Sequence, residues 1–74
     1  MSPDKLVTMA NQIGKFFAHE GDDKAAASIA DHLEKFWEPR MRAALLAHYR
    51  SGGEGLEPLA RRAVSIMKVP GAGG

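Results

Sequence analysis

The chain has 74 residues, with ten Lys and Arg against nine Asp and Glu, and it has no cysteine. This length makes one small domain, and the lack of cysteine excludes a disulfide framework, a thiolate zinc site and a Cys-ligated iron–sulfur cluster. The net charge of +1 is far below that of a dedicated nucleic-acid-binding domain. Such short domains depend on idealised helix packing or on a partner for stability. These properties favour part of an assembly over a self-sufficient enzyme.

Membrane insertion and secretion are both disfavoured. No apolar run approaches the roughly 20 residues that a membrane-spanning helix needs. The N-terminal residues lack the charged segment followed by an apolar stretch that is typical of a secretory signal. We therefore expect a cytoplasmic protein that does not enter a membrane.

The first predicted helix covers residues 3–18. Ser2 is a favourable N-cap, Pro3 suits the first helical position, and Gly21 is expected to end the helix. Apolar residues recur with a period of 3.6 and predict one buried face. This face consists of Leu6, Met9, Ala10, Ile13, Phe16 and Phe17.

A second line of small or polar residues follows one flank of this helix, at Val7, Asn11, Gly14 and Ala18. A glycine inside a helix costs about 1 kcal/mol relative to alanine, which indicates that something approaches closely there. Another helix of the same domain could cover the flank. Alternatively, a helix or loop of a partner protein could dock on it, with Asn11 donating and accepting hydrogen bonds.

Two further helices meet at Pro39, over residues 23–36 and 39–50. Asp22 or Asp23 is expected to cap the first of them, and Pro39 ends it because a residue before proline is pushed out of the helical region. Pro39 also suits the first position of the next helix. The predicted apolar face of the first consists of Ala26, Ile29, Ala30, Leu33, Phe36 and Trp37, and that of the second of Met41, Ala44, Leu45 and His48.

The charges of these two helices differ in sign. Residues 20–38 contain six acids and two lysines, whereas residues 39–50 contain three arginines and no acid. The two helices could pack beside each other in the domain, or one charged face could meet a charged partner.

A glycine-rich loop at residues 51–55 separates these helices from a fourth, which begins near Pro58 and continues to about Lys68. Residues 69–74 are expected to form a flexible tail. No alternating pattern indicates a strand. We predict an all-α fold, a single domain over residues 1–68 with three to four short helices in an orthogonal or bundle-like arrangement. The inward residues of the fourth helix are Leu56, Leu59, Ala60, Ala63, Val64 and Met67.

No pattern of catalytic or metal-binding residues is present. The three histidines, His19, His32 and His48, form no pair at metal-ligand spacing, and no cysteine can complete a site. The hydroxyl residues match no nucleophile motif, and residues 52–55 lack the features of a phosphate-binding loop. We expect no catalytic, cofactor-binding or metal-binding residue, and we expect His32 to stack on Phe36 or to cap its helix.

The segment 36–42 has the composition of an interface hot spot, with aromatic, arginine and methionine side chains. Adjacent residues on a helix point about 100° apart, so Phe36 and Trp37 cannot both be central to one narrow face. We assign Phe36 to the core and Trp37 to the edge, as an interface anchor. Arg40 and Arg42 lie in the first turn of a helix, where a cation opposes the helix dipole.

That unfavourable placement indicates a compensating contact. The acids Glu34 and Glu38 could supply it within the chain, or carboxylates of a partner could supply it from outside.

These motifs, read together, resemble a known family. The chain is similar to the delta subunit of the soluble, NAD-dependent formate dehydrogenases that contain molybdenum (in some members tungsten), over roughly residues 3–67. The residues that carry the resemblance are Met9-Ala10-Asn11-Gln12-Ile13, Phe16-Phe17, His32, Phe36-Trp37-Glu38-Pro39-Arg40-Met41-Arg42, Gly52-Gly53, Leu56 and Pro58-Leu59.

The resemblance implies a complex that oxidises formate to carbon dioxide and reduces NAD. Its alpha subunit would hold the molybdopterin guanine dinucleotide centre and iron–sulfur clusters, and its beta and gamma subunits FMN and further clusters. The delta subunit is expected to hold no cofactor. It would bind the alpha subunit as a non-catalytic accessory chain that supports assembly or stability.

Two alternatives accompany this interpretation. The chain could be a transient, chaperone-like factor for cofactor insertion, or a small helical nucleic-acid-binding module, which the low net charge disfavours. We expect no nucleic-acid partner. The hypothetical partner-binding residues are Asn11, Gln12, Gly14, His32, Trp37, Glu38, Arg40, Met41 and Arg42.

Overall fold

Four α-helices and one short 3₁₀ turn make up the fold of the described residues. The computed structural model describes residues 2–67, and no strand occurs within them. The prediction of a small all-α domain is confirmed. The elements in chain order are α1 (Pro3–Phe17), η1 (Ala18–Glu20), α2 (Asp22–Phe36), α3 (Pro39–Arg50) and α4 (Pro58–Ile66).

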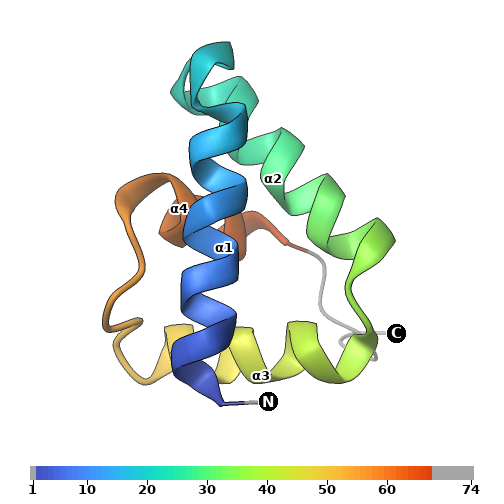
Figure 1. The fold of residues 1–74 in the computed structure, drawn as a ribbon, viewed down its shortest axis with the longest axis vertical. Helices are drawn as coiled ribbons and strands as arrows, with labels where there is room; N and C mark the ends of the chain where they lie inside the picture. Colours follow the sequence, from blue (N-terminus) through green and yellow to red (C-terminus); the bar gives the residue numbers. More distant parts are fainter. Residues whose placement is uncertain (1, 68–74) are drawn as a thin grey trace.

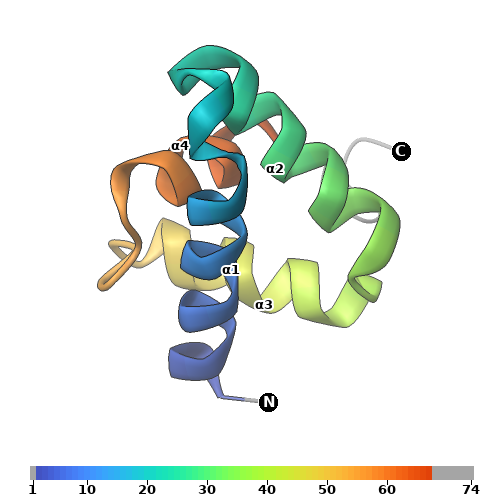
Figure 2. The ribbon, with the colours of Figure 1, turned by 45° about the horizontal axis from the view of Figure 1, so that its top comes forward.

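The helices cross one another at large angles. α1 and α2 diverge from the η1 turn like the two sides of a V, and α3 lies across the open end of that V (Figure 1). α4 lies behind α1 in both views and packs chiefly against α2 (Figure 2). This is the orthogonal arrangement that was one of the two predicted.

Proline defines the start of three helices. Pro3, Pro39 and Pro58 each occupy the first turn, where the fixed φ of proline is helical and its missing N–H is not needed. Before Pro3, the Ser2 hydroxyl accepts a hydrogen bond from the Lys5 amide at 3.5 Å, which confirms Ser2 as an N-cap.

α2 begins one residue earlier than predicted. Its N-cap is Gly21, at φ 94° and ψ 152°, so the expectation that Asp22 or Asp23 caps it is wrong. Both carboxylates lie in the first turn instead, where they interact favourably with the helix dipole. At the other end of the chain, α4 stops at Ile66. Lys68 and the predicted tail at 69–74 lie outside the described residues.

One hydrophobic core joins all four helices. It confirms the predicted inward face of α2 from Ile29 to Leu33, and it adds Leu46 of α3, which the sequence pattern did not assign. The buried members are Leu6, Val7, Ala10, Ile29, Ala30, Leu33, Trp37, Leu45, Leu46, Leu56, Ala60, Ala63, Val64 and Met67.

Phe36 and Trp37 occupy the opposite places from those predicted. Trp37 is only 6% exposed and belongs to the core, whereas Phe36 is 72% exposed. α2 ends at Phe36, and the backbone of Trp37 is extended, at φ −87° and ψ 142°. The 100° helical step therefore does not apply to Trp37, which turns inward. The assignment of Phe36 to the core and Trp37 to the edge is wrong.

The apolar stripe of α1 is only partly covered. Leu6 and Ala10 are buried as predicted, but Gly14, predicted on the flank, is buried too, because α1 turns that flank toward the rest of the domain. Ile13 is half-buried, and Phe16 remains 72% exposed. The fold therefore leaves part of a continuous apolar stripe at the surface.

Candidate functional site

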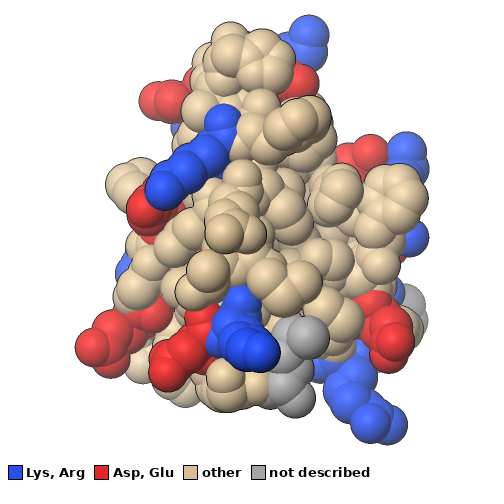
Figure 3. All heavy atoms as spheres, viewed as in Figure 1, with Lys and Arg blue, Asp and Glu red and all other residues tan. Residues whose placement is uncertain are grey.

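An apolar groove lies between α1 and α2, inside the V that these helices form. We call it the α1–α2 groove. Its volume is about 450 Å³, and none of the described residues that line it is charged. Figure 3 shows uncharged surface between α1 and α2, with charged side chains around it. The lining residues are Met9, Gln12, Ile13, Phe16, Phe17, His32 and Trp37.

A row of four rings crosses the groove from one helix to the other. The rings of Phe16 and Phe17 meet edge to face, with centroids 5.1 Å apart. Phe17 lies 6.1 Å from the His32 ring, and His32 lies 4.8 Å from Phe36. These are favourable aromatic geometries, and they confirm that His32 stacks on Phe36.

The two ends of this row are unusually exposed. Phe16 on α1 and Phe36 on α2 are each 72% exposed. Within the described residues, the other large apolar side chain exposed to a similar degree is Ile66 of α4, at 52%. Contiguous apolar surface of this kind on a small domain is typical of interaction sites and of ligand-binding grooves.

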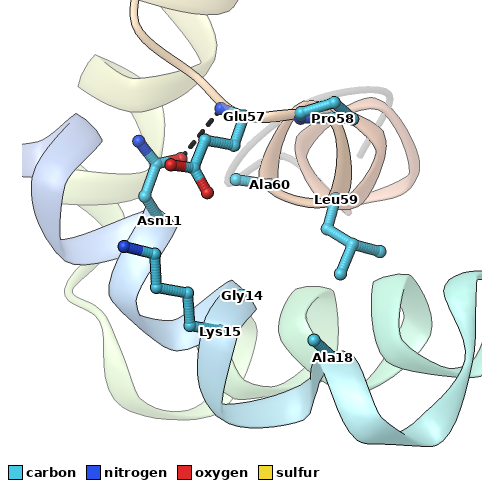
Figure 4. Close-up of a pocket in the computed structure, with 8 residues that line it drawn as sticks. All are labelled: Asn11, Gly14, Lys15, Ala18, Glu57, Pro58, Leu59 and Ala60. Atoms are coloured by element: carbon cyan, nitrogen blue, oxygen red, sulfur yellow. Dashed lines mark hydrogen bonds between the residues drawn. The ribbon is translucent and has the colours of Figure 1, made fainter.

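The flank of α1 faces the start of α4 across a pocket of about 190 Å³, which Asn11, Gly14 and Ala18 help to line (Figure 4). Figure 4 shows Asn11 facing the residues that precede α4. Its Nδ2 donates to the Gly55 carbonyl oxygen at 2.9 Å, and its Oδ1 accepts from the Glu57 amide at 2.9 Å. Asn11 therefore ties the loop before α4 to α1, which supports the interpretation of this flank as a contact within the domain.

Gly14 lies under the first turn of α4, on the same flank (Figure 4). A Cβ atom at this position would be 3.8 Å from Ile29 Cδ1 and 3.9 Å from both Leu59 Cβ and the Ala60 nitrogen. The close approach that a mid-helix glycine indicates is thus made by α4 and α2.

Arg42 closes the end of α2. Its Nη1 donates to the carbonyl oxygens of Glu34 at 3.1 Å and Leu33 at 3.4 Å, and to that of Trp37. The last carbonyls of a helix carry partial negative charge, so a cation is favourable there. These backbone carbonyls provide the compensating contact that was predicted for Arg42 from its unfavourable place in the first turn of α3.

The other residues of the 36–42 corner face solvent or the core. Glu38 and Arg40 are exposed, and Met41 is half-buried against the core. Among the predicted partner-binding residues, the structure brings Gln12, His32 and Trp37 together in the α1–α2 groove. Asn11, Gly14 and Arg42 make contacts within the domain instead.

Sequence reasoning missed most of the groove. Met9, Ile13, Phe16 and Phe17 were assigned to the core with the rest of the α1 stripe, and Phe36 was assigned to the core of α2. The signal that could have found them is the width of the apolar stripe on α1, because a chain of 74 residues has too few other helices to cover all of it.

Across residues 2–67, no three His, Cys, Asp or Glu side chains gather in a way that could hold a metal ion. In the same part of the chain, no helix combines the length and the apolar character needed to cross a membrane.

Comparison with known families decides the identity of this domain. The family model of the NADH-dependent formate dehydrogenase delta subunit, FdsD, matches residues 5–64. The chain belongs to this delta subunit family. The match begins in the first turn of α1 and ends in α4, so the delta subunit domain includes both walls of the α1–α2 groove. No curated protein and no solved structure matched the chain.

Proposed function

We propose that this delta chain is a non-catalytic subunit of a formate dehydrogenase that binds the large alpha subunit and supports the assembly or stability of the complex. The observation that carries the proposal is the α1–α2 groove, an uncharged apolar surface left open by a chain that belongs to a subunit family. Binding of a partner that removes such an apolar surface from water is energetically favourable.

Burial of apolar surface favours association of the delta chain with its partner, and this association in turn stabilises the folded delta chain. Burial of apolar surface contributes about 25 cal/mol per Å², and Phe16 and Phe36 offer two large, mostly exposed rings. A partner that binds only the folded chain also stabilises it by mass action. Mutual stabilisation is how a small chain without catalytic groups can support a large complex.

Under this proposal the redox chemistry belongs to other subunits. The alpha subunit holds the molybdopterin guanine dinucleotide and iron–sulfur clusters, and the beta and gamma subunits hold FMN and further clusters. The complex works in the cytoplasm, oxidising formate to carbon dioxide and reducing NAD. The delta chain contributes contact surface.

The test is to express the complex with and without the delta chain and to quantify the alpha subunit in the assembled, active fraction. We expect an affinity-tagged delta chain to recover the alpha subunit in stoichiometric amount, and we expect less assembled complex, with a lower melting temperature, when it is omitted. Failure of the unaltered chain to recover the alpha subunit would overturn the proposal. Recovery only from immature, cofactor-free complex would instead identify a transient assembly factor.

A further inference from the structure

We propose that the α1–α2 groove receives one short, uncharged apolar helix from the alpha subunit, an inference that rests on the proposed function. Among residues 2–67, no segment covers the groove, although its lining continues directly into the core through Trp37. An apolar ridge in the groove would therefore extend the core of this domain into its partner.

The shape of the groove favours a helix over a second copy of the chain. A pocket of about 450 Å³ makes the surface between α1 and α2 concave, and the two helices diverge as a V (Figure 1). Two such concave faces placed together would leave a void, which protein interiors avoid. A convex helix fits between diverging helices, as in other helix-in-groove complexes.

The length of the groove sets the length of its occupant. From Met9 to Phe16 the lining covers seven residue steps along α1, or roughly 10 Å at 1.5 Å per residue. An occupant of about two turns covers that distance. Its apolar anchors are expected at positions i, i+3 or i+4, and i+7, which lie on one face of a helix.

Charge defines the chemistry of the contacting face. Within residues 2–67, the lining carries no charged side chain, and beside it on α2 Lys35 and Asp31 form an ion pair at 3.1 Å. At the corner, the exposed Glu38 and Arg40 have opposite signs. A strongly charged ligand finds no opposite charge in this lining, whereas an uncharged apolar face matches its apolar character. The Gln12 amide and the His32 ring provide the polar contacts that fix its register.

The first experiment measures binding of the alpha subunit by delta chains that carry a charge on the rim. Phe16→Glu and Phe36→Glu, separately and together, place carboxylates at the two ends of the aromatic row. Ile66→Glu is the matched control, because it adds the same charge at an exposed apolar residue outside the groove lining. We expect the double variant to bind roughly 30-fold more weakly, as for loss of an interface hot spot, and the control to bind normally.

Circular dichroism of each variant shows that loss of binding is not loss of folding. Both phenylalanines are 72% exposed, so the helix content should be retained. Unchanged binding by a folded double variant would overturn the groove proposal while leaving the proposed function intact. If the unaltered chain does not bind the alpha subunit, the proposed function fails first, and the groove proposal fails with it.

The second experiment identifies the occupant. Because the chain has no cysteine, Gln12→Cys places one unique thiol in the groove for a photoactivated crosslinker, and Ala47→Cys on the exposed face of α3 is the control. In the assembled complex we expect Gln12→Cys to crosslink to a helical, apolar segment of the alpha subunit, located by mass spectrometry. Crosslinking to a second delta chain, or to a charged or non-helical segment, would overturn the proposal.

Discussion

The guanidinium group of Arg42, in the first turn of α3, donates a hydrogen bond to the carbonyl oxygen of Trp37, the residue that follows the last residue of α2. The same nitrogen lies 3.1 Å from the carbonyl oxygen of Glu34. One side chain thus joins two consecutive helices and holds the extended backbone that turns Trp37 into the core. The corner next to the α1–α2 groove depends on this contact.

Replacing Arg42 should destabilise the domain. Arg42→Met keeps much of the hydrophobic stem but removes the donors, so we expect the free energy of unfolding to fall by about 1.5–3 kcal/mol, the range for hydrogen bonds to a charged group. Urea denaturation followed by circular dichroism measures it. Arg40→Met is the control, because Arg40 is exposed and opposes the dipole of α3. Equal effects of the two variants would contradict the role assigned to Arg42.

Trp37 and Phe36 should differ sharply in their contribution to stability. Trp37→Ala opens a cavity in the core, which costs about 3–5 kcal/mol for a large aromatic residue. The total free energy of unfolding of a domain of this size is roughly 4–11 kcal/mol, so the variant should be largely unfolded at modest urea concentration. Phe36→Ala removes an exposed ring and should change the free energy of unfolding by about 0.5 kcal/mol. A stable Trp37→Ala variant would be inconsistent with the buried position of Trp37.

Asn11 should stabilise the fold through the loop that precedes α4. Asn11→Ala removes two hydrogen bonds, to Gly55 and Glu57, at about 0.5–1.5 kcal/mol each. We expect a loss of roughly 1–3 kcal/mol by urea denaturation and faster hydrogen exchange at the Glu57 amide. Gln12→Ala, at the exposed neighbouring position, should leave both measurements unchanged. Normal exchange at Glu57 in Asn11→Ala would show that the bridge is not formed.

Gly14→Ala should stabilise the domain. The added methyl group would lie 3.8–3.9 Å from its neighbours, which is ordinary van der Waals contact, and alanine is favoured over glycine inside a helix by about 1 kcal/mol. We expect the melting temperature to rise by roughly 4–8 °C per kcal/mol gained. Binding of the alpha subunit should not change, since Gly14 is buried and faces α4 and Ile29. A folded Gly14→Ala variant that loses binding would show that a partner occupies the flank.

The helices themselves follow closely from the sequence. Prolines at 3, 39 and 58 mark helix starts because their backbone geometry and missing N–H suit only that part of a helix. The inward face of α2 follows from periodicity, since its apolar residues through Leu33 all lie within a continuous helix. Helix-capping and periodicity rules therefore predict helix starts and buried faces wherever the backbone is regularly helical.

Irregular geometry is where prediction failed. Trp37 lies just outside α2, so helical periodicity gave its direction wrongly, and Phe36 was misplaced with it. Arg42 acts on a helix other than its own, which no spacing rule indicates. The groove could not be separated from the core because the apolar stripe of α1 is continuous in sequence. Only the packing of α2 and α4 shows which part of it, such as Phe16, is left uncovered.

The most direct test of the central claim is a structure of the assembled formate dehydrogenase complex that includes this chain, determined by cryo-electron microscopy. Phe16 and Phe36 are each 72% exposed in the chain alone. In the complex we expect both rings to be buried by a helix of the alpha subunit that lies in the α1–α2 groove. An assembled complex in which both rings remain exposed to solvent, while another face of the chain contacts the alpha subunit, would contradict it.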